Sequence, residues 1–344
     1  MKALVLAAGL GTRLRPLTES WPKPALPLLG QPLLRYTLAV LARAGVTEVG
    51  INTHHLADVM ARVAEAETAR AGMQLALSHE SVIQGTAGGI RGLRRVVEDT
   101  DTFVVWNGDA LFTPELGTLV AEHRASGATA TLLLLPMPKG ASYASVDIDA
   151  EGRVRRIAGR GPGGPALSAW HFSGVHLLSP RVFSAISEAG PEDINRDVYP
   201  RLLKKGELVR GAVVHAAWRD VGTPAGYLLA QQALLVGDVP DVFGESSPFA
   251  RAAGANGVWK APGATLRGKA QPPVYLDRAA VVEAGAEVGP NVYFGPGVHV
   301  PSGSHVAQAA LLEGAAPEGR LERLLLWRGG RLSAPGPESE SGVA

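Results

Sequence analysis

The sequence predicts an α/β protein: a Rossmann-like, mixed but mostly parallel sheet with helices on both faces, followed by a short C-terminal left-handed parallel β-helix. Two observations lead to this prediction. Over residues 1–236, short apolar runs alternate with helical stretches, as in a mostly parallel sheet. From residue 258 onward, apolar residues recur at every sixth position, which is the period of a parallel β-helix. A chain of 344 residues has room for about two such domains.

The expected strands of the sheet are apolar along their length, as burial on both faces requires. They are Ala3–Leu6, Glu48–Asn52, Gln74–Ser78, Phe103–Trp106 and Thr129–Leu135. The expected helices have apolar residues at every third or fourth position. They are Leu33–Ala44, Leu56–Arg70 and Leu116–Ser126. Over residues 145–156 apolar and polar residues alternate instead, which predicts an antiparallel hairpin that turns at residues 149–152.

The six-residue repeat is set by Leu276, Val282, Val288, Phe294, Val300, Val306 and Leu312. Two positions before these stand the small or apolar residues Ala280, Ala286, Val292, Val298, Ser304 and Ala310. Each hexapeptide would form one face of a coil, so the stretch predicts about two or three coils. The expected order is a first domain over 1–236, a Gly- and Pro-rich linker over 237–257, the β-helix over 258–316, and an extension over 317–344 whose tail is expected to be disordered.

Composition limits the classes of partner. The chain has 33 basic and 32 acidic residues, so no basic surplus points to nucleic acid, and a small anionic ligand needs only a local positive site. The absence of cysteine excludes disulfides and thiolate metal sites. The apolar run at residues 3–8 is too short for a membrane span and is followed by glycines. We therefore expect a buried first strand in a cytoplasmic protein without a membrane partner.

A glycine-rich turn follows the first strand in residues 6–14, LAAGLGTRL. Gly9 and Gly11 allow backbone N–H groups to approach phosphate oxygens, and Arg13 adds a planar, permanently charged group suited to a polyphosphate. Lys23 stands between two prolines, which would hold its ammonium in position. A P-loop would need a lysine directly after its second glycine, and a dinucleotide fingerprint would need glycine at position 14, where this chain has leucine. A tight turn that binds nothing would need only one glycine.

Residues 9–18, GLGTRLRPLT, together with the Pro-Lys-Pro at 22–24, closely resemble the signature of the sugar-1-phosphate nucleotidyltransferases. The resemblance extends over most of residues 1–235, and several branches of that family also carry a β-helix. It implies an enzyme that joins a nucleoside triphosphate to a sugar 1-phosphate with the help of Mg²⁺ and releases pyrophosphate.

Two aspartates are the candidate metal ligands. Asp109 follows a buried strand, and an aspartate at the carboxyl end of a parallel strand faces the crevice where ligands bind. Asp220 lies in the segment WRDVGTP at 218–224. Alone, each would fit a turn or a helix cap. The pair resembles the metal-binding segments of the family in the same order, which implies one Mg²⁺ whose other ligands are water and phosphate oxygens.

The resemblance implies an in-line attack of the sugar phosphate on the α-phosphorus. The expected catalytic residues are Arg13, Lys23, Asp109 and Asp220. Arg13 would hold the leaving β- and γ-phosphates, and Lys23 would contact the sugar phosphate or the α-phosphate. The expected nucleotide-binding residues are Leu6, Ala8, Gly9, Gly11, Thr12, Arg13, Glu80, Gly85, Thr86, Asn107 and Gly108. The expected sugar-phosphate-binding residues are Lys23, Gly174 and Asn195.

The segment HESVIQGTAGG at 79–89 resembles the base-reading loop of the family. A carboxylate such as that of Glu80 only accepts hydrogen bonds. Guanine offers it two adjacent donors, whereas uracil and thymine offer one N–H between two carbonyls. Glu80 therefore favours guanine, and GTAG at 85–88 is similar to the mannose-1-phosphate guanylyltransferases. The alternative is an exposed loop glutamate, with Gln84 reading a pyrimidine.

The family's Glu-Lys-Pro motif after the hairpin is replaced here by RIAGRGP at 156–162. This departure, with FSGV at 172–175, also resembles the N-acetylmuramate-1-phosphate uridylyltransferases. Uridylyl or thymidylyl transfer to N-acetylmuramate, glucose or glucosamine-type 1-phosphates thus stays open, as does a non-catalytic, nucleotide-sugar-binding regulatory subunit. Asn195 would also fit the start of a helix. The β-helix could stabilise the protein or form a homo-oligomer, and an acyl-transfer activity using His299 or His305 is a further alternative.

Overall fold

The computed structural model describes residues 1–344 except 139–142, 166, 245–246, 248, 250–252 and 335–344. The chain divides into two compact units that alternate along the sequence. Unit 1 contains Met1–Leu10, Thr37–Gly108 and Pro114–Ala216, and unit 2 contains Gly11–Tyr36, Asp109–Thr113 and Ala217–Ala344. Two segments of the N-terminal region, 11–36 and 109–113, therefore pack with the C-terminal residues, which differs from the division at residue 236 that the sequence suggests.

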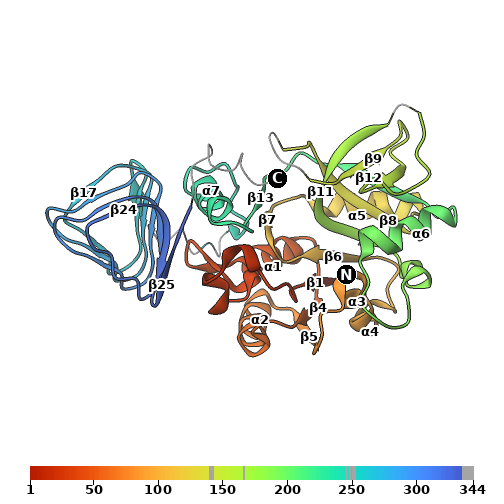
Figure 1. Cartoon of the computed structure of the whole chain (residues 1–344), viewed down its shortest axis with the longest axis horizontal. Coiled ribbons are helices and arrows are strands. Elements are labelled where there is room, and N and C mark those ends of the chain that lie inside the picture. Colours follow the sequence, from red (N-terminus) through yellow and green to blue (C-terminus); the bar gives the residue numbers. More distant parts are fainter. Residues whose placement is uncertain (139–142, 166, 245–246, 248, 250–252, 335–344) are drawn as a thin grey trace. The chain divides into compact units, whose positions relative to one another are not determined.

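Unit 1 is built on a nine-stranded sheet with the order β10-β9-β11-β6-β1-β4-β5, in which β8 pairs with β11 and β12 (Figure 1). Its strands are β1 (Lys2–Leu6), β4 (Glu48–Thr53), β5 (Gln74–His79), β6 (Phe103–Asn107), β8 (Ala130–Leu135), β9 (Ser145–Ile148), β10 (Val154–Ile157), β11 (Ser168–Leu178) and β12 (Val209–Val213). β1 lies parallel to β4 and β6, and β11 lies antiparallel to β6, β8 and β9. The mixed, Rossmann-like sheet and the predicted hairpin are confirmed.

The helices of unit 1 are α2 (Ala57–Ala71), α3 (Gly85–Gly92), α4 (Arg94–Val97), α5 (Leu116–Ser126) and α6 (Tyr199–Lys204). A further helix, α1 (Leu33–Arg43), starts in unit 2 and ends in unit 1. Residues of β1 are buried as predicted, because the sheet is covered on both faces. In the register of the sheet, Leu6 at the end of β1 pairs with Asn52 on β4 and with Asn107 on β6. At the carboxyl ends of these central strands, Leu6 therefore has one asparagine on each side, Asn52 and Asn107.

His176 lies on β11 in the core of unit 1, with no exposed surface, and its Nδ1 shares a hydrogen bond with the Tyr199 hydroxyl. Burial lowers the pKa of His176 from 6.5 to about 3. Between these two pH values the unfolded chain binds a proton that the folded chain does not. The stability that neutral His176 provides is therefore complete above pH 6.5 and is lost progressively as the pH falls towards 3.

We expect His176→Gln to reduce the slope of unfolding free energy against pH between pH 4.5 and 6.5, by up to about 1.4 kcal/mol per pH unit. Urea denaturation at several pH values measures this slope. His215→Gln, which makes the same substitution at an exposed histidine, is the control variant. Equal slopes in wild type and His176→Gln would show that His176 does not titrate differently in the folded chain.

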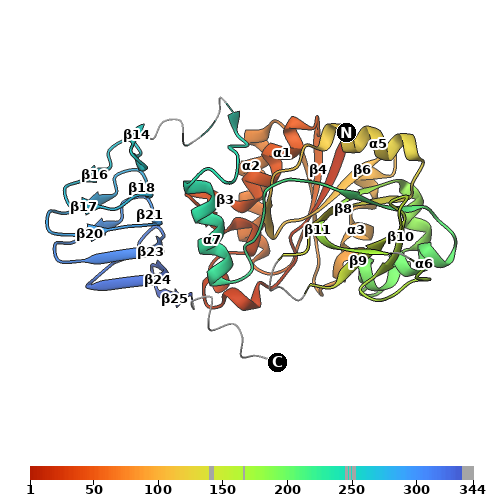
Figure 2. The same ribbon diagram turned by 90° about the horizontal axis from the view of Figure 1, so that it is seen from above.

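Unit 2 contains the β-helix (Figures 1 and 2). Its strands are β14 (Ala253–Ala255), β15 (Val258–Lys260), β16 (Thr265–Leu266), β17 (Lys269–Ala270), β18 (Val274–Leu276), β19 (Val281–Val282), β20 (Glu287–Val288), β21 (Val292–Phe294), β22 (His299–Val300), β23 (His305–Leu311), β24 (Arg320–Trp327) and β25 (Gly330–Ser333). Parallel ladders join β15, β18, β21, β23 and β24 on one face and β16, β19 and β22 on another. β17, β20 and β23 form the third.

The residues of the predicted six-residue repeat are all buried, and the prediction of a parallel β-helix is confirmed. The repeat holds up to Val306 and then shifts by one residue. Ala309 and Leu311 pair with Val292 and Phe294 and join the apolar core, at the places expected for the residues that follow each of them. β23 thus has one residue fewer between Val306 and Ala309 than the preceding coil has between Val288 and Val292, and the parallel ladder continues across this shift.

The boundaries of the β-helix differ from the expectation at both ends. The parallel ladder extends to β24, past the expected end at residue 316, and β14 occupies part of the expected linker. His299 and His305 begin strands and lie beside Glu283 and Glu287 on the outer surface. The tail at 335–344 lies outside the described residues.

The remainder of unit 2 consists of short elements and one longer helix. They are η1 (Thr12–Leu14), η2 (Leu17–Glu19), η3 (Lys23–Ala25), β2 (Pro27–Leu28), β3 (Gln31–Pro32), β7 (Ala110–Phe112), β13 (Trp218–Asp220) and α7 (Pro224–Leu235). Gln231 on α7 is buried, and its Nε2 donates to the Ala309 carbonyl on β23 at 3.1 Å. This bond ties α7 to the β-helix within the unit.

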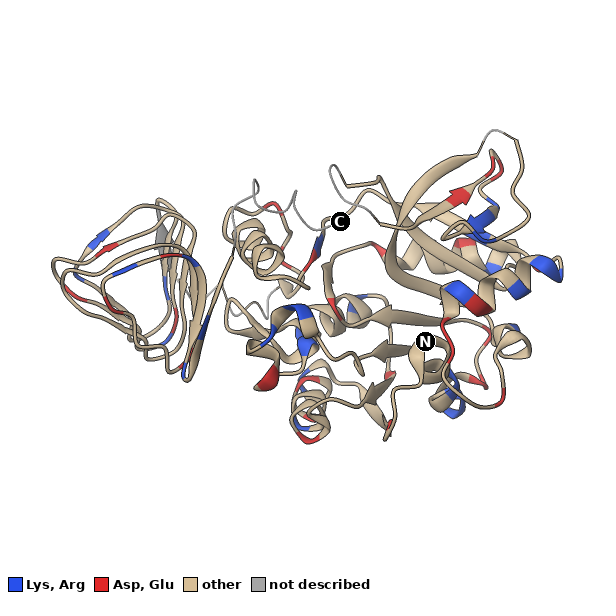
Figure 3. Cartoon of the chain, viewed as in Figure 1, with Lys and Arg blue, Asp and Glu red and all other residues tan. Residues whose placement is uncertain are grey.

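Charged residues of both signs are interspersed along the elements of the two units (Figure 3), in keeping with the nearly equal numbers of acidic and basic residues. Among the described residues, every helix is too short or too polar to cross a membrane.

Candidate functional site

Four charged side chains that the sequence singles out come together in unit 2, and we call them the charge cluster: Arg13, Lys23, Asp109 and Asp220. The Lys23 ammonium lies 3.1 Å from Asp109 Oδ2 and 3.7 Å from Asp220 Oδ1. Arg13 Nη2 lies 3.7 Å from Asp220 Oδ2. Both carboxylates thus contact the same nitrogen atom, so they are close enough to share a cation. The Lys23 side chain is 8% exposed, whereas that of Asp109 is 53% exposed.

The pairing of two short strands brings the carboxylates together. β7 runs antiparallel to β13, and Asp220 at the end of β13 pairs with Ala110, the residue directly after Asp109. The two cations come from 3₁₀ helices, with Arg13 on η1 and Lys23 at the start of η3. The prolines on either side of Lys23 restrict its backbone. The cluster is therefore held by short elements whose backbones have little freedom.

Gly222, which lies in the WRDVGTP segment two residues after Asp220, packs against the charge cluster. A Cβ at this position would lie 2.5 Å from Arg13 Nη2, 2.7 Å from Asp220 Oδ1 and 2.9 Å from Lys23 Nζ. The Gly222 amide also donates to Asp220 Oδ1 at 2.7 Å. Only a residue without a side chain lets these three charged groups occupy their observed positions.

The glycine-rich turn begins in unit 1 and continues into unit 2. Leu6 ends β1, and Ala8 and Gly9 follow it without regular structure. Gly11 precedes η1 with a positive φ of 60°, and a Cβ there would lie 2.8 Å from Thr18 Cγ2. The Thr18 hydroxyl donates to the Gly11 carbonyl at 2.9 Å. The conformation therefore requires glycine at position 11, whereas a Cβ on Gly9 would point into open space.

The candidate base loop lies in unit 1, where Glu80 is 6% exposed. One of its carboxylate oxygens accepts a hydrogen bond from Asn52 Nδ2 at 2.7 Å, and the other accepts one from the Gln84 amide at 2.8 Å. Asn52 Oδ1 in turn accepts a bond from the Ala7 amide at 2.7 Å. Glu80 is thus buried, in contrast to the exposed loop glutamate of the alternative interpretation. Both oxygens keep lone pairs that a ligand could use.

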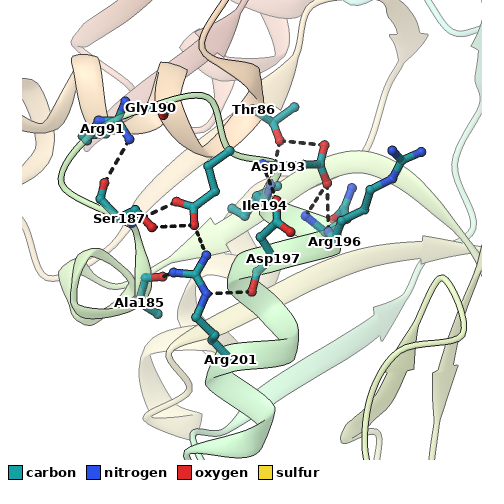
Figure 4. Close-up of polar contacts among 12 residues, drawn as sticks. Thr86, Arg91, Ala185, Ser187, Gly190, Asp193, Ile194, Arg196, Asp197 and Arg201 are labelled. Atoms are coloured by element: carbon teal, nitrogen blue, oxygen red, sulfur yellow. Dashed lines mark hydrogen bonds and ion pairs between the residues drawn. The ribbon is translucent and has the colours of Figure 1, made fainter.

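The side chains of Gln84 and Thr86 are bonded within the protein. Gln84 Nε2 donates to the Val82 carbonyl at 2.8 Å, and Gln84 Oε1 accepts a bond from Arg91 at 3.2 Å. The Thr86 hydroxyl donates to Asp193 at 3.2 Å and accepts a bond from the Ile194 amide at 2.8 Å (Figure 4). This loop is therefore fixed before any ligand is bound.

An ion pair of the buried Glu192 holds the segment that supports the base loop. The Glu192 carboxylate pairs with Arg201 on α6 and accepts two bonds from Ser187, each at 2.9 Å. The Glu192 amide donates to the Gln84 carbonyl at 2.8 Å. A Cβ on Gly85 would lie 2.4 Å from the Glu192 carbonyl oxygen, so the loop needs glycine at this point of close approach. Figure 4 shows Arg201 together with Ser187 in this network.

The remaining sequence candidates lie in two places in unit 1. The Gly108 amide donates to the Leu6 carbonyl at 2.9 Å, and a Cβ on Gly174 would lie 3.1 Å from Asn107 Cβ. Asn107 Oδ1 is buried and has no hydrogen-bond partner among the described residues. Asn195 is the second residue of the π-helical turn Ile194–Val198, and its amide donates to the Asp193 side chain at 2.9 Å. Asn195 thus lies at the start of a helix, in agreement with its alternative interpretation.

The family model described as Nucleotidyl transferase matches residues 2–236, which is more than half of the chain. The chain belongs to the nucleotidyl transferase family. This family contains proteins named for sugar 1-phosphates: a UTP--glucose-1-phosphate uridylyltransferase of Synechocystis sp. is 32% identical over 254 residues, which cover 70% of this chain and 65% of that protein. A mannose-1-phosphate guanylyltransferase of Mycobacterium tuberculosis is 32% identical over 298 residues, which cover 84% of this chain and 77% of that protein.

The mannose-1-phosphate guanyltransferase beta-B of Xenopus laevis is 30% identical over 230 residues, or 66% of this nucleotidyl transferase. The matches span 65% and 63% of the lengths of the Synechocystis and Xenopus proteins, so this chain covers less than two thirds of each. Among solved structures, HddC from Yersinia pseudotuberculosis has a TM-score of 0.58 and 21% identity, and covers 68% of this chain and 99% of its own. That likeness supports the nucleotidyl transferase fold of this chain.

Proposed function

We propose that this nucleotidyl transferase joins a nucleoside triphosphate to a sugar 1-phosphate, forming a nucleotide-sugar and releasing pyrophosphate. The observation that carries the proposal is the charge cluster, in which two cations and two carboxylates contact one another in a chain of this family. The substrates are both anions, and a site that binds them needs cations for their phosphates. It also needs carboxylates that can hold a divalent cation.

The reaction requires the protein to position the two substrates and to stabilise the negative charge on their phosphates. An oxygen of the sugar phosphate attacks the α-phosphorus in line with the leaving pyrophosphate, and no covalent nucleophile is needed. The planar guanidinium of Arg13 suits the β- and γ-phosphates, which it can bind through two parallel hydrogen bonds. The ammonium of Lys23 is a compact charge on a flexible stem, suited to the sugar phosphate or the α-phosphate as charge develops there.

Asp109 and Asp220 fit a Mg²⁺ ion, because carboxylate oxygens are among its preferred ligands and one nitrogen already contacts an oxygen of each. Among the described residues there is no group of three or more acidic or histidine side chains that could hold a metal. Phosphate oxygens and water would therefore supply the other ligands. When bound, Mg²⁺ would neutralise charge on the phosphate oxygens.

For the base we propose guanine, and for the sugar mannose 1-phosphate. The buried Glu80 carboxylate can accept bonds from the two adjacent donors of guanine, and its position is fixed by Asn52 and the Gln84 amide. The similarity to the guanylyltransferase of Mycobacterium tuberculosis, which extends over 84% of this chain, supports the same choice. The similarity to the Synechocystis uridylyltransferase favours UTP and glucose 1-phosphate as the second candidate. Since the substrates are charged metabolites, we propose that the reaction takes place in the cytoplasm.

A pyrophosphate-release assay tests these proposals. GTP, UTP, dTTP and ATP are each combined with mannose, glucose, glucosamine and N-acetylmuramate 1-phosphates in the presence of Mg²⁺. We expect the highest kcat/KM for GTP with mannose 1-phosphate. A higher value for UTP with another sugar would replace the proposed base and sugar but retain the reaction. The absence of turnover with all pairs, together with binding of a nucleotide-sugar, would favour a regulatory subunit.

A further inference from the structure

We propose that the Lys23 ammonium occupies the position between the Asp109 and Asp220 carboxylates in the free protein. A divalent cation would then bind the charge cluster tightly only together with the triphosphate. This inference rests on the proposed function, because it concerns the carboxylates that would hold the metal. It specifies the order of events at Lys23: the ammonium first occupies the position of the metal ion and then moves to a phosphate.

The geometry of Lys23 carries the proposal. Its nitrogen contacts one oxygen of Asp109 at 3.1 Å and one oxygen of Asp220 at 3.7 Å, which is where a cation shared by the two would sit. The side chain is almost fully buried, and the prolines on either side restrict its backbone. The ammonium is therefore held beside both carboxylates when no ligand is bound.

Charge then opposes a free divalent cation. Arg13 contacts the second oxygen of Asp220 at 3.7 Å, so two positive groups face two negative ones and the charges within the cluster cancel. A divalent cation that approaches this neutral cluster would be repelled by Lys23 and Arg13. Mg²⁺ also gives up its water reluctantly, and two carboxylates alone replace few of its ligands.

A triphosphate changes this balance because it brings several negative charges. Lys23 and Arg13 are both long, flexible side chains whose ends can turn from the carboxylates to phosphate oxygens. Asp109 and Asp220 are then released, and the phosphates supply further oxygen ligands for the metal. The two binding events favour each other, and by linkage the metal must strengthen nucleotide binding by the same factor.

Mn²⁺ titration of the full chain, followed by electron paramagnetic resonance, measures metal affinity without any turnover. In the absence of nucleotide, we expect Lys23→Met to bind Mn²⁺ at least about tenfold more tightly than wild type, because a unit charge about 4 Å away has been removed. Lys23→Arg keeps the charge and should retain weak binding. Lys260, an exposed lysine on β15, offers a matched control, and Lys260→Met should bind Mn²⁺ as wild type does.

The same titration is repeated with the α,β-methylene analogue of GTP, corrected for Mn²⁺ bound by the analogue alone. Wild type should then bind Mn²⁺ more tightly, and Lys23→Met should show a smaller gain. If nucleotide-free Lys23→Met binds Mn²⁺ no more tightly than nucleotide-free wild type, the proposal that Lys23 excludes the metal is overturned. This holds even if the analogue promotes metal binding in wild type. Failure of wild type to bind Mn²⁺ together with the analogue of GTP, and likewise with that of UTP, would instead contradict the proposed function.

Circular dichroism establishes that each variant is folded. Should Lys23→Met be unfolded, Arg13→Met replaces it, because the Arg13 side chain is 61% exposed and its loss should disturb the fold little. We expect Arg13→Met to tighten Mn²⁺ binding in the same direction but by a smaller factor, since Arg13 pairs with Asp220 whereas Lys23 pairs with both carboxylates. Unchanged Mn²⁺ affinity in this variant would count against the proposal.

Discussion

Replacement of Asp220 by Asn should lower kcat/KM in the pyrophosphate-release assay by about 10³-fold, or about 4 kcal/mol of transition-state stabilisation. The asparagine side chain would have nearly the same shape as the native carboxylate, and its amide oxygen could still accept the bond from the Gly222 amide. What disappears is one negative charge next to Lys23 and Arg13. The fold should persist, because the substitution changes neither volume nor the backbone pairing of β13 with β7.

Asp238 provides the matched control for this substitution, since it is an exposed aspartate of the same unit. Asp238→Asn should retain wild-type kcat/KM. Higher Mg²⁺ concentrations should restore part of the lost activity of Asp220→Asn if the carboxylate holds the metal. If the kcat/KM of Asp220→Asn is within about threefold of the wild-type value, the charge cluster does not take part in the proposed reaction.

The parts of the fold that the sequence could predict are those in which periodicity follows directly from burial. The apolar strands such as Phe103–Asn107 are covered on both faces, and the β-helix repeats a buried residue at every sixth position, so both patterns are visible without any contact information. The C-terminal end of the β-helix could not be predicted from this pattern. β24 joins the ladder through Arg320–Trp327, where the six-residue pattern has ended.

The charge cluster was predictable as a set of residues, because glycine, arginine, lysine and aspartate occur there in motifs with a clear chemical use. Its geometry was not. β7 and β13 have three residues each, too few to show a pattern, and yet their pairing determines that Asp109 and Asp220 meet. That Lys23 contacts the carboxylates, where the sequence suggested only a phosphate, depends on the same pairing.

The support of the base loop was also missed. Glu192 and Gln84 are distant in sequence, and nothing local marks Glu192 as the partner of Arg201 or of the loop. A buried carboxylate with a charged partner becomes visible only when the fold brings α6 against the segment after β11. Sequence motifs thus point to candidate substrate-binding residues such as Glu80, but they do not point to residues such as Glu192 that hold the loop in place.

The role of Gly222 leads to the second large expected effect. Gly222→Ala should reduce kcat/KM by about 10²-fold, because the new methyl group would lie within 3 Å of charged atoms of Arg13, Asp220 and Lys23 and would force them apart. These atoms are the ends of flexible side chains, which can move without disturbing the core. The free energy of unfolding should therefore change by less than about 1 kcal/mol.

Activity and stability thus separate in this variant, and they are measured by pyrophosphate release and by urea denaturation on the same preparation. Gly117→Ala on α5 is the control, because a Cβ there meets open space and should leave kcat/KM unchanged. A loss of stability in Gly222→Ala equal to its loss of activity would mean that Gly222 serves the fold. Wild-type activity in a folded Gly222→Ala protein would mean that turnover does not depend on Arg13, Lys23 and Asp220 keeping their observed positions, since the methyl group cannot be accommodated without moving them.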